Sequence, residues 1–570
     1  MEWSRLTDIT RIAYFSMEIG LSQEIPTYSG GLGILAGDTI KSAADLQIPL
    51  VAVTLISRKG YFEQTIDAQG RQHERPSAWD VAAMLELLPT RVTVTIEDRL
   101  VVVQAWLYRV KSPSGGVVPV LFLDTDLEEN TPKDRAITDV LYGGDAAYRL
   151  KQEVVLGIGG VRILAGLGFK VFQYHMNEGH AALLTLELLN QTRNLTATTW
   201  TETLEYDRPA VARRCIFTTH TPVPAGHDRF PYDLVRQVLG EHLVPLTTLR
   251  ELAGHDELNM TTLALKLSRF VNGVAKKHGQ VSQAMFPGYE IHAITNGIHP
   301  LTWASPYMMA LFNRFIQGWA LQPELLVRVD NVPDEEIWDA HQGAKAYLAQ
   351  YIQEVTGQKL YLDVLTIGFA RRVAAYKRND LIFHDVKRLL DIGRGRLQLI
   401  FAGKSHPHDE SGKAMIQRIH DFIRQLQGQI SIIYLPNYNM DVAYRLLPGV
   451  DLWLNTPIRP LEASGTSGMK AALNGVPNFS ILDGWWIEGH IEGVTGWSIG
   501  APPTELQANN STEADAADLY DKLERVIMPL YYEDRPGWIR VMKDAIGKNA
   551  YYFNTHVMMR RYVTEAYLQR

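Results

Sequence analysis

The first part of the chain either alternates apolar and polar residues or runs through short apolar blocks, and both patterns predict β-strands. Residues 11–15 and 49–56 are predicted strands. Residues 91–111 alternate on both sides of Glu97, Asp98 and Arg99, which predicts a hairpin. We therefore expect this opening stretch to be rich in β structure.

The period of the apolar positions changes after Asp145. Residues 146–167 repeat apolar side chains every three or four positions, as an amphipathic helix does. Short apolar strands then alternate with helical patterns, at residues 170–175, 215–219 and 291–295. A parallel sheet covered by helices has this order of elements.

The second half repeats the alternation with five apolar blocks, at residues 365–369, 397–402, 430–434, 451–455 and 478–482. A turn-rich stretch from Asn296 to Pro300 separates the two regions. We predict an α/β fold with two doubly wound, Rossmann-like domains, residues 1–296 and 297–570, facing a central cleft. The helices expected after residue 518 are long enough to pack back on the first domain.

Composition narrows the class of protein. Apolar residues make up 46% and charged residues 21% of the 570 positions, the balance of a water-soluble globular protein. No stretch approaches the roughly 20 apolar residues that span a bilayer, and no apolar signal core begins the chain. The single cysteine, Cys215, excludes an internal disulfide, and the net charge of −7 disfavours a nucleic-acid surface. We expect a cytoplasmic protein that binds neither membrane nor nucleic acid.

One segment after the predicted strand 451–455 combines small residues with a lysine. Gly465, Thr466, Ser467 and Gly468 precede Lys470 at a helix start, so their backbone N–H groups can face an anion. A lysine among apolar neighbours has a lowered pKa, and its free amine forms a Schiff base with an aldehyde. The arrangement suits a cofactor with an aldehyde and a phosphate. Spacing alone equally allows a serine- and glycine-rich helix cap with an exposed lysine.

The same segment closely resembles the cofactor motif of the glycogen (α-glucan) phosphorylase family, and the likeness extends over nearly the whole chain. Further matching segments follow in the family's order: Glu18 with residues 28–33, then residues 150–153, 177–180, 219–222, 295–298, 371–378, 437–438 and 533–538. The resemblance implies the GT-B glycosyltransferase architecture and pyridoxal 5′-phosphate bound to Lys470. It also implies a retaining reaction, in which a terminal α-1,4-glucosyl unit of maltodextrin or glycogen passes to inorganic phosphate and gives α-glucose 1-phosphate.

The resemblance also assigns roles to individual residues. The catalytic set that it implies is Arg372 and Lys377 for the substrate phosphate, with His220 and Glu462 for sugar hydroxyls. The implied cofactor contacts are Lys470, Thr466, Ser467, Gly468, Arg371 and Tyr438. The further implied substrate contacts are Gly30, Gly31, Leu32, Asn296, Ala463, Ser464 and Gly465. Arginine clamps and backbone amides stabilise phosphate charge without a metal ion.

Several of these features have a plainer interpretation when each is taken alone. A glycine turn between strand and helix, or a basic pair on a solvated helix face, is common without any ligand. A histidine that follows a strand, as His220 does, more often has a structural role. Trp303, Trp485 and Trp486 are more expected in the core than stacked on a sugar.

Two clusters have the composition of a metal site. His175, Glu178 and His180 surround one strand-to-helix turn, and residues 406–410 follow another strand. Neither has the i, i+4 spacing of a helical zinc motif. We therefore predict no metal, with hydrogen bonds to substrate or loops instead.

The chain departs from the longer members of the family at several points. It lacks the segment that in those members precedes the strand beginning here at residue 11 and holds phosphorylation and effector contacts, so we expect activity without AMP. The loop of residues 142–145 is shorter than the expected active-site gate. Further departures are Ala374 and Ala375 for a His-Glu pair, Arg371 for a lysine, and Gly468 and Ser29 for asparagines. These changes resemble the short bacterial or archaeal members.

Two other functions compete with this interpretation. A nucleotide-sugar-dependent glucan synthase shares the architecture and a similar glycine loop, but it has no use for an aldehyde cofactor on Lys470. A catalytically inactive glucan-binding protein has no use for a phosphate clamp. Bound pyridoxal phosphate and a phosphorolysis assay separate the three. The glucan length, the direction in the cell and the oligomeric state stay open, and a homodimer is compatible with the sequence.

Overall fold

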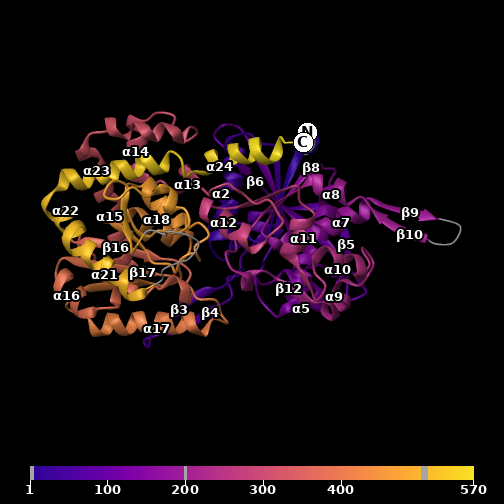
Figure 1. Ribbon diagram of the computed structural model, residues 1–570, viewed down its shortest axis with the longest axis horizontal. Coiled ribbons are helices and arrows are strands. Elements are labelled where there is room, and N and C mark those ends of the chain that lie inside the picture. Colours follow the sequence, from indigo (N-terminus) through magenta and orange to yellow (C-terminus); the bar gives the residue numbers. More distant parts are fainter. Residues whose placement is uncertain (1–5, 198–201, 502–510, 570) are drawn as a thin grey trace.

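The computed structural model describes residues 6–197, 202–501 and 511–569, which form two α/β lobes lying side by side (Figure 1). The N-terminal lobe is built on a nine-stranded sheet in the order β15-β14-β11-β8-β1-β2-β7-β6-β5. Its strands are β1 (Thr10–Ser16), β2 (Leu50–Leu55), β5 (Glu86–Ile96), β6 (Arg99–Lys111), β7 (Val117–Asp124), β8 (Lys170–Asn177), β11 (Cys215–Thr218), β14 (Phe270–Gly273) and β15 (His292–Ala293). The pairs from β15 to β7 are parallel, and β6 and β5 add an antiparallel edge.

The mixture of patterns in the sequence explains this sheet. The continuous apolar runs of β1 and β2 are buried because helices cover both faces, whereas β5 alternates as an edge strand does. The predicted hairpin is confirmed, with Glu97 and Asp98 both at positive φ in its two-residue turn. Strand β5 begins five residues before the predicted start, and β7 was not predicted.

Helices of the N-terminal lobe connect these strands. Those used below are α2 (Gly31–Asp45), α5 (Ala146–Val154), α6 (Gly160–Gly166), α7 (Leu184–Gln191), α9 (Tyr232–Leu239) and α12 (Lys276–Met285). The predicted helix of residues 146–167 is present as α5 and α6, joined by the π-helical turn η2 (Val155–Gly159). The predicted strand 291–295 is reduced to the two residues of β15.

The C-terminal lobe is built on a six-stranded parallel sheet in the order β18-β17-β16-β19-β20-β21. Its strands are β16 (Leu365–Ala370), β17 (Leu397–Ala402), β18 (Ser431–Leu435), β19 (Leu452–Asn455), β20 (Asn478–Ile481) and β21 (Gly496–Ile499). The five predicted strands are confirmed within one or two residues, and β21 was not predicted. Helices used below are α13 (Pro300–Trp303), α15 (Asp334–Thr356), α17 (Glu410–Gln425), α18 (Met440–Gly449), α19 (Thr466–Leu473) and α23 (Arg535–Ala545).

Two segments tie the lobes together. The helix α24 (Thr555–Arg561), yellow in Figure 1, returns to the N-terminal lobe and packs against α2. There Ser42 and Thr555 join their hydroxyls at 2.5 Å. From the other side, the hairpin of β3 (Glu63–Ile66) and β4 (Gln72–Arg75) reaches the C-terminal lobe, where Gln64 and Asn437 exchange two hydrogen bonds. A domain boundary at residue 296 stays a prediction.

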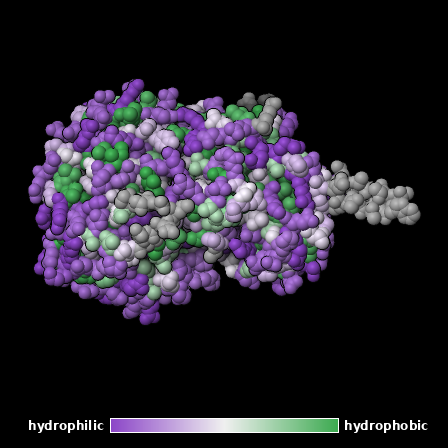
Figure 2. Space-filling view, viewed as in Figure 1, coloured by the Kyte–Doolittle hydropathy of each residue, from purple (hydrophilic) through white to green (hydrophobic). Residues whose placement is uncertain are grey.

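The surface in view is mostly hydrophilic, with apolar residues scattered rather than gathered (Figure 2). Scattered apolar residues are normal on a folded protein. Among the described residues, no helix is both long and apolar enough to cross a bilayer. A hairpin of β9 (Arg193–Ala197) and β10 (Glu202–Tyr206) projects from the N-terminal lobe (Figure 1).

Candidate active site

The predicted site residues follow the carboxyl ends of strands where the order of each sheet reverses. In the N-terminal lobe β1 lies between β2 and β8, and Glu18 and Asn177 lie at the ends of β1 and β8. In the C-terminal lobe β16 lies between β17 and β19, and Arg371 and Asn455 lie at the ends of β16 and β19. Doubly wound sheets bind ligands at such reversal points. Both lobes therefore offer their binding edges to one site.

Lys470 lies in α19, where its side chain is buried against Trp303 of α13. Its Nζ atom lies 3.6 Å from the centre of the Trp303 ring, and the residue is 6% exposed. Among the described residues it has no hydrogen-bond acceptor and no carboxylate within ion-pair distance. Burial lowers the pKa of Lys470 to about 8, opposed by the charge of Asp38 and assisted by that of Lys41. An amine with this pKa is partly unprotonated at neutral pH, as an attack on an aldehyde requires.

The start of α19 is open to an anion. Gly465 precedes it with φ of 89°, a left-handed conformation that suits glycine. No side chain caps the helix, so the first amides, those of Thr466, Ser467 and Gly468, have no cap acceptor. A partly unprotonated lysine one turn further along fits a phosphate-bearing aldehyde. The residues present therefore fit pyridoxal phosphate.

Gly468 is required by packing rather than by its conformation. A Cβ atom there would meet the side-chain amide oxygen of Asn478 and would lie 2.9 Å from the Trp485 ring. Asn478 in turn donates to the carbonyl of Gly468 at 2.9 Å. The glycine that departs from the longer family members thus makes room for the neighbouring strand β20. Trp485 and Trp486 are buried in the core, as the plainer interpretation predicts.

Glu462 is the centre of a buried charge cluster. Its Oε2 atom accepts from Lys377 Nζ at 2.7 Å and also from the guanidinium of Arg371, which reaches Asn455 as well. Burial disfavours the ionised carboxylate, but the charges of Arg371 and Lys377 outweigh it and lower the pKa of Glu462 to about 2. The backbone N–H of Glu462 is held by Asp483 Oδ2 at 2.9 Å. The cluster thus presents an ionised acceptor beside two cations.

Arg372 has a different environment from Arg371. It is exposed and, in the part of the chain that the structure describes, has no hydrogen-bond or ion-pair partner. Its charge acts on Tyr61 of the N-terminal lobe and on His406 and Asp409 of the loop after β17. Of the two residues predicted to clamp phosphate, Lys377 is therefore engaged with Glu462 and Arg372 is free.

The glycine loop is organised by Glu18. The carboxylate of Glu18 accepts from the backbone N–H groups of Ser29 at 2.6 Å and Gly30 at 3.1 Å. It also accepts from the hydroxyl of Tyr142 at 3.1 Å, in the loop of residues 142–145. A Cβ atom at Gly30 or Gly31 would meet nothing within 4 Å, so open space lies beside this helix start. The Gly30 amide thus donates to Glu18, whereas the amides of Gly31 and Leu32 have no such partner.

The loop also contacts the other lobe. The hydroxyl of Tyr28 accepts from the backbone N–H of Met440 at 3.0 Å, at the start of α18. Tyr438, two residues earlier, is half-buried, and burial together with Tyr28 raises its pKa. The predicted cofactor contact Tyr438 therefore lies where the glycine loop meets the C-terminal lobe.

His220 follows β11 and is held on two sides. Its backbone N–H donates to Glu178 Oε2 at 2.7 Å, and its Nε2 contacts Asn177 Oδ1 at 2.6 Å. Burial lowers the pKa of His220 to about 3, so the ring is neutral at pH 7. Two other predicted sugar contacts, Asn296 Oδ1 and Ser464 Oγ, are buried without a hydrogen-bond partner. Orphaned polar atoms of this kind are explained when a ligand supplies the partner.

Several residues that lie in the candidate site were not predicted from the sequence. Asp38 accepts from the Trp303 indole, Asn177 orients His220, and Asp483 holds the Glu462 backbone. Asn177 and Asp483 follow predicted strands, a position at which polar residues gather at one sheet edge. Asp38 lies inside a helix, where no sequence signal separates it from a surface residue.

The two clusters with metal-like composition have other roles. His175 contacts the hydroxyls of Tyr567 and Thr218, both at 2.8 Å. The rings of His406 and His408 lie 5.5 Å apart and are tilted by 39°, and burial together with the charges of His408 and Arg372 lowers the pKa of His406. Within residues 6–197, 202–501 and 511–569 no group of three or more His, Cys, Asp or Glu is arranged to hold a metal ion.

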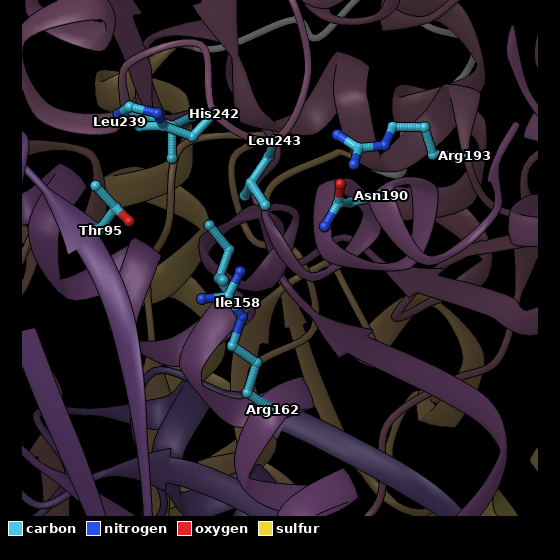
Figure 3. Close-up of a pocket in the computed structure, with 8 residues that line it drawn as sticks. All are labelled: Thr95, Ile158, Arg162, Asn190, Arg193, Leu239, His242 and Leu243. Atoms are coloured by element: carbon cyan, nitrogen blue, oxygen red, sulfur yellow. The ribbon is translucent and has the colours of Figure 1, made fainter. Parts of the chain in front are cut away.

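A separate cavity of about 200 Å³ lies in the N-terminal lobe, away from these residues (Figure 3). Arg162 of α6, Asn190 of α7 and His242 line part of it. Arg162 is already paired with Glu187 at 2.8 Å, and His242 contacts Asp98 at 3.1 Å. This cavity includes none of the predicted site residues.

Comparisons with known proteins identify the family of the chain. A family model described as carbohydrate phosphorylase matches residues 244–530. Maltodextrin phosphorylase of Thermococcus litoralis is 40% identical over 98% of this chain and 70% of its own length. Glycogen phosphorylases of Mycobacterium tuberculosis and Aquifex aeolicus are 38% and 35% identical over 98% of this chain, and over 71% and 86% of their own lengths. The chain belongs to the carbohydrate phosphorylase family.

Proposed function

We propose that this protein is an α-glucan phosphorylase that holds pyridoxal 5′-phosphate on Lys470 and transfers a terminal α-1,4-glucosyl unit to inorganic phosphate. The observation that carries the proposal is the environment of Lys470. It combines a buried amine of lowered pKa with a helix start whose amides are uncapped. A nucleotide-sugar synthase needs neither feature, and nothing in the site favours that alternative.

Some residues of the site bind the sugar and others bind the phosphate. His220, neutral and oriented by Asn177, presents its free Nδ1 to a sugar hydroxyl, while Asn296 and Ser464 supply unpartnered polar atoms. Glu462 adds an ionised acceptor for further hydroxyls. Arg372 and Lys377 bring positive charge to the substrate phosphate, and the Gly31 amide at an open helix start is a further donor for it.

The bond changes follow from this placement. The bond between glucosyl C1 and the glycosidic oxygen breaks, and a bond from C1 to a phosphate oxygen forms on the same face. The departing oxygen takes a proton from the substrate phosphate, so the products are α-glucose 1-phosphate and a glucan shortened by one unit. When bound, pyridoxal phosphate supplies through its own phosphate an acid–base group that titrates near neutral pH. The protein thus needs no carboxylic general acid of the glycosidase kind.

The deciding experiment separates cofactor attachment from reaction. Reduction of the purified protein with borohydride, digestion and mass spectrometry should locate a pyridoxyl group on Lys470. Incubation with maltooligosaccharides and phosphate should release α-glucose 1-phosphate, whereas nucleotide sugars should give no chain extension. Lys470→Ala should abolish both the label and the reaction. An unlabelled Lys470 in an active protein, or β-glucose 1-phosphate as product, would contradict the proposal.

A further inference from the structure

Asp38 contacts the tryptophan against which the proposed cofactor lysine packs. It lies in α2 of the N-terminal lobe, and its Oδ2 atom accepts from the indole N–H of Trp303 at 2.8 Å. Lys470 lies over the face of the same indole, with its Nζ 3.6 Å from the ring centre, whereas the N–H that Asp38 accepts points outward in the ring plane. The three side chains come from α2, α13 and α19, and the Trp303 indole contacts both of the others.

The second oxygen of Asp38 has no partner. Asp38 is 1% exposed, and its Oδ1 atom is buried without a hydrogen bond. No cation of the described residues lies within ion-pair distance of this carboxylate. A buried carboxylate with one orphaned oxygen is costly unless a positive group compensates it. We therefore expect a positive group at the site that compensates the charge of Asp38.

The charged groups that act on the Lys470 nitrogen are few. Asp38 favours its protonated form, and Lys41, one turn further along α2, disfavours it. Lys41 is itself tied back by Thr302, whose Oγ1 accepts from its Nζ at 3.2 Å. Trp303 contacts the carboxylate through its N–H and the lysine through its ring face. An indole whose N–H is donated to an anion presents a more electron-rich face to a cation.

We infer that Asp38 is the counter-charge of the cofactor site: through Trp303 it positions the Lys470 nitrogen and balances the positive charge that this nitrogen carries. The inference rests on the proposed function, because it concerns the lysine that is proposed to hold the cofactor. Asp38 is a positioning residue, since it reaches Lys470 through the Trp303 ring. Its effect is on the protonation of one nitrogen, which can be measured without any turnover.

The test follows the attachment of pyridoxal 5′-phosphate to the full chain after the resident cofactor has been removed. The rate of attachment depends on the unprotonated fraction of Lys470, so its pH midpoint reports the pKa of this amine. Asp38→Asn keeps the shape and an acceptor for the Trp303 N–H but removes the negative charge. The midpoint should therefore move to lower pH, by about one unit. Borohydride trapping and mass spectrometry confirm that Lys470 is the residue labelled.

Lys41→Gln is the matched control on the same helix. It removes a positive charge, so the midpoint should move to higher pH. Opposite shifts in two neighbouring variants cannot come from a general loosening of α2. An unchanged midpoint in Asp38→Asn, or shifts of the same sign in both variants, would overturn the inference. If Lys470 carries no label even in the unaltered protein, the proposed function fails instead, so the two failures are distinguishable.

Discussion

Asn177 contacts the ring of His220 through its side-chain oxygen, 2.6 Å from Nε2. Because Asn177 Nδ2 donates to Ser16 Oγ at 3.1 Å, the oxygen end of the amide faces the histidine. An amide oxygen only accepts, so Nε2 carries the ring proton and Nδ1 is left as an acceptor. The pair thus selects the tautomer that can accept a hydrogen bond from a sugar hydroxyl.

Changing this pair should therefore impair catalysis without unfolding the protein. We expect Asn177→Ala to lower kcat/KM for the glucan by about tenfold or more, since one oriented hydrogen bond contributes roughly 1.4 kcal/mol. Steady-state kinetics measure the loss, and nitrogen NMR of the His220 ring should show a mixture of tautomers. Asn177→Asp is the companion variant: its carboxylate should raise the His220 pKa above about 3. A single unchanged tautomer in Asn177→Ala would rule out this role.

Arg372 is the free cation of the proposed phosphate clamp, in contrast to Arg371. Replacing it by alanine should raise the KM for phosphate about tenfold to a hundredfold and slow turnover, because charged hydrogen bonds contribute roughly 1.5–3 kcal/mol. The control is Arg418→Ala. Arg418 is an exposed arginine of α17 that pairs with Asp380. Arg418→Ala should leave phosphate kinetics unchanged. Normal phosphate kinetics in Arg372→Ala would contradict the proposed role of Arg372 in binding phosphate.

Asp483 predicts a particular pH dependence of stability. Burial, assisted by the charge of Glu462, raises the pKa of Asp483 from 3.8 to about 7. Between pH 3.8 and pH 7 the folded state therefore holds a proton that the unfolded state has lost. The contribution of Asp483 to stability is fully present below pH 3.8 and is lost as the pH rises through 7. Asp483→Asn should remove that dependence.

The free energy of unfolding of Asp483→Asn, relative to that of the unaltered protein, should rise by about 3 kcal/mol between pH 5 and pH 8. Thermal melting of both proteins across this range measures the difference. Between pH 8 and pH 9 the difference should stay constant, which is an internal control. A difference that does not change between pH 5 and pH 8 would show that Asp483 is ionised throughout.

Gly468 offers a test of packing beside the cofactor helix. Gly468→Asn restores the residue of the longer family members but drives a side chain into Asn478 and Trp485. We expect the free energy of unfolding to fall by about 1–3 kcal/mol, which a lower melting temperature would show. Gly31→Ala is the control for stability, because its Cβ atom enters open space. If Gly468→Asn melts at the same temperature as the unaltered protein, the contact does not constrain this position.

Much of the fold could be predicted from the sequence, because buried parallel strands are continuous apolar runs whatever surrounds them. Strand β17 occupies the predicted residues, and the helix start before Lys470 follows from local glycine and serine chemistry. Strand β7 was overlooked although it has the same kind of run, and β15 is shorter than its apolar block. These local features are encoded by neighbours in the chain.

The pairings that define the site could not be predicted in this way. Asp38 and Trp303 are 265 positions apart, and Asn177 and His220 are 43 apart, so no periodicity connects them. Only the folding of the two lobes onto each other brings Asp38 to the Trp303 indole that Lys470 covers. The sequence by itself predicted most strands and many candidate site residues, but not the roles of Asp38, Asn177 and Asp483. The tertiary structure decided which of them share charge and hydrogen bonds, because those interactions depend on distance in space and on exclusion of water.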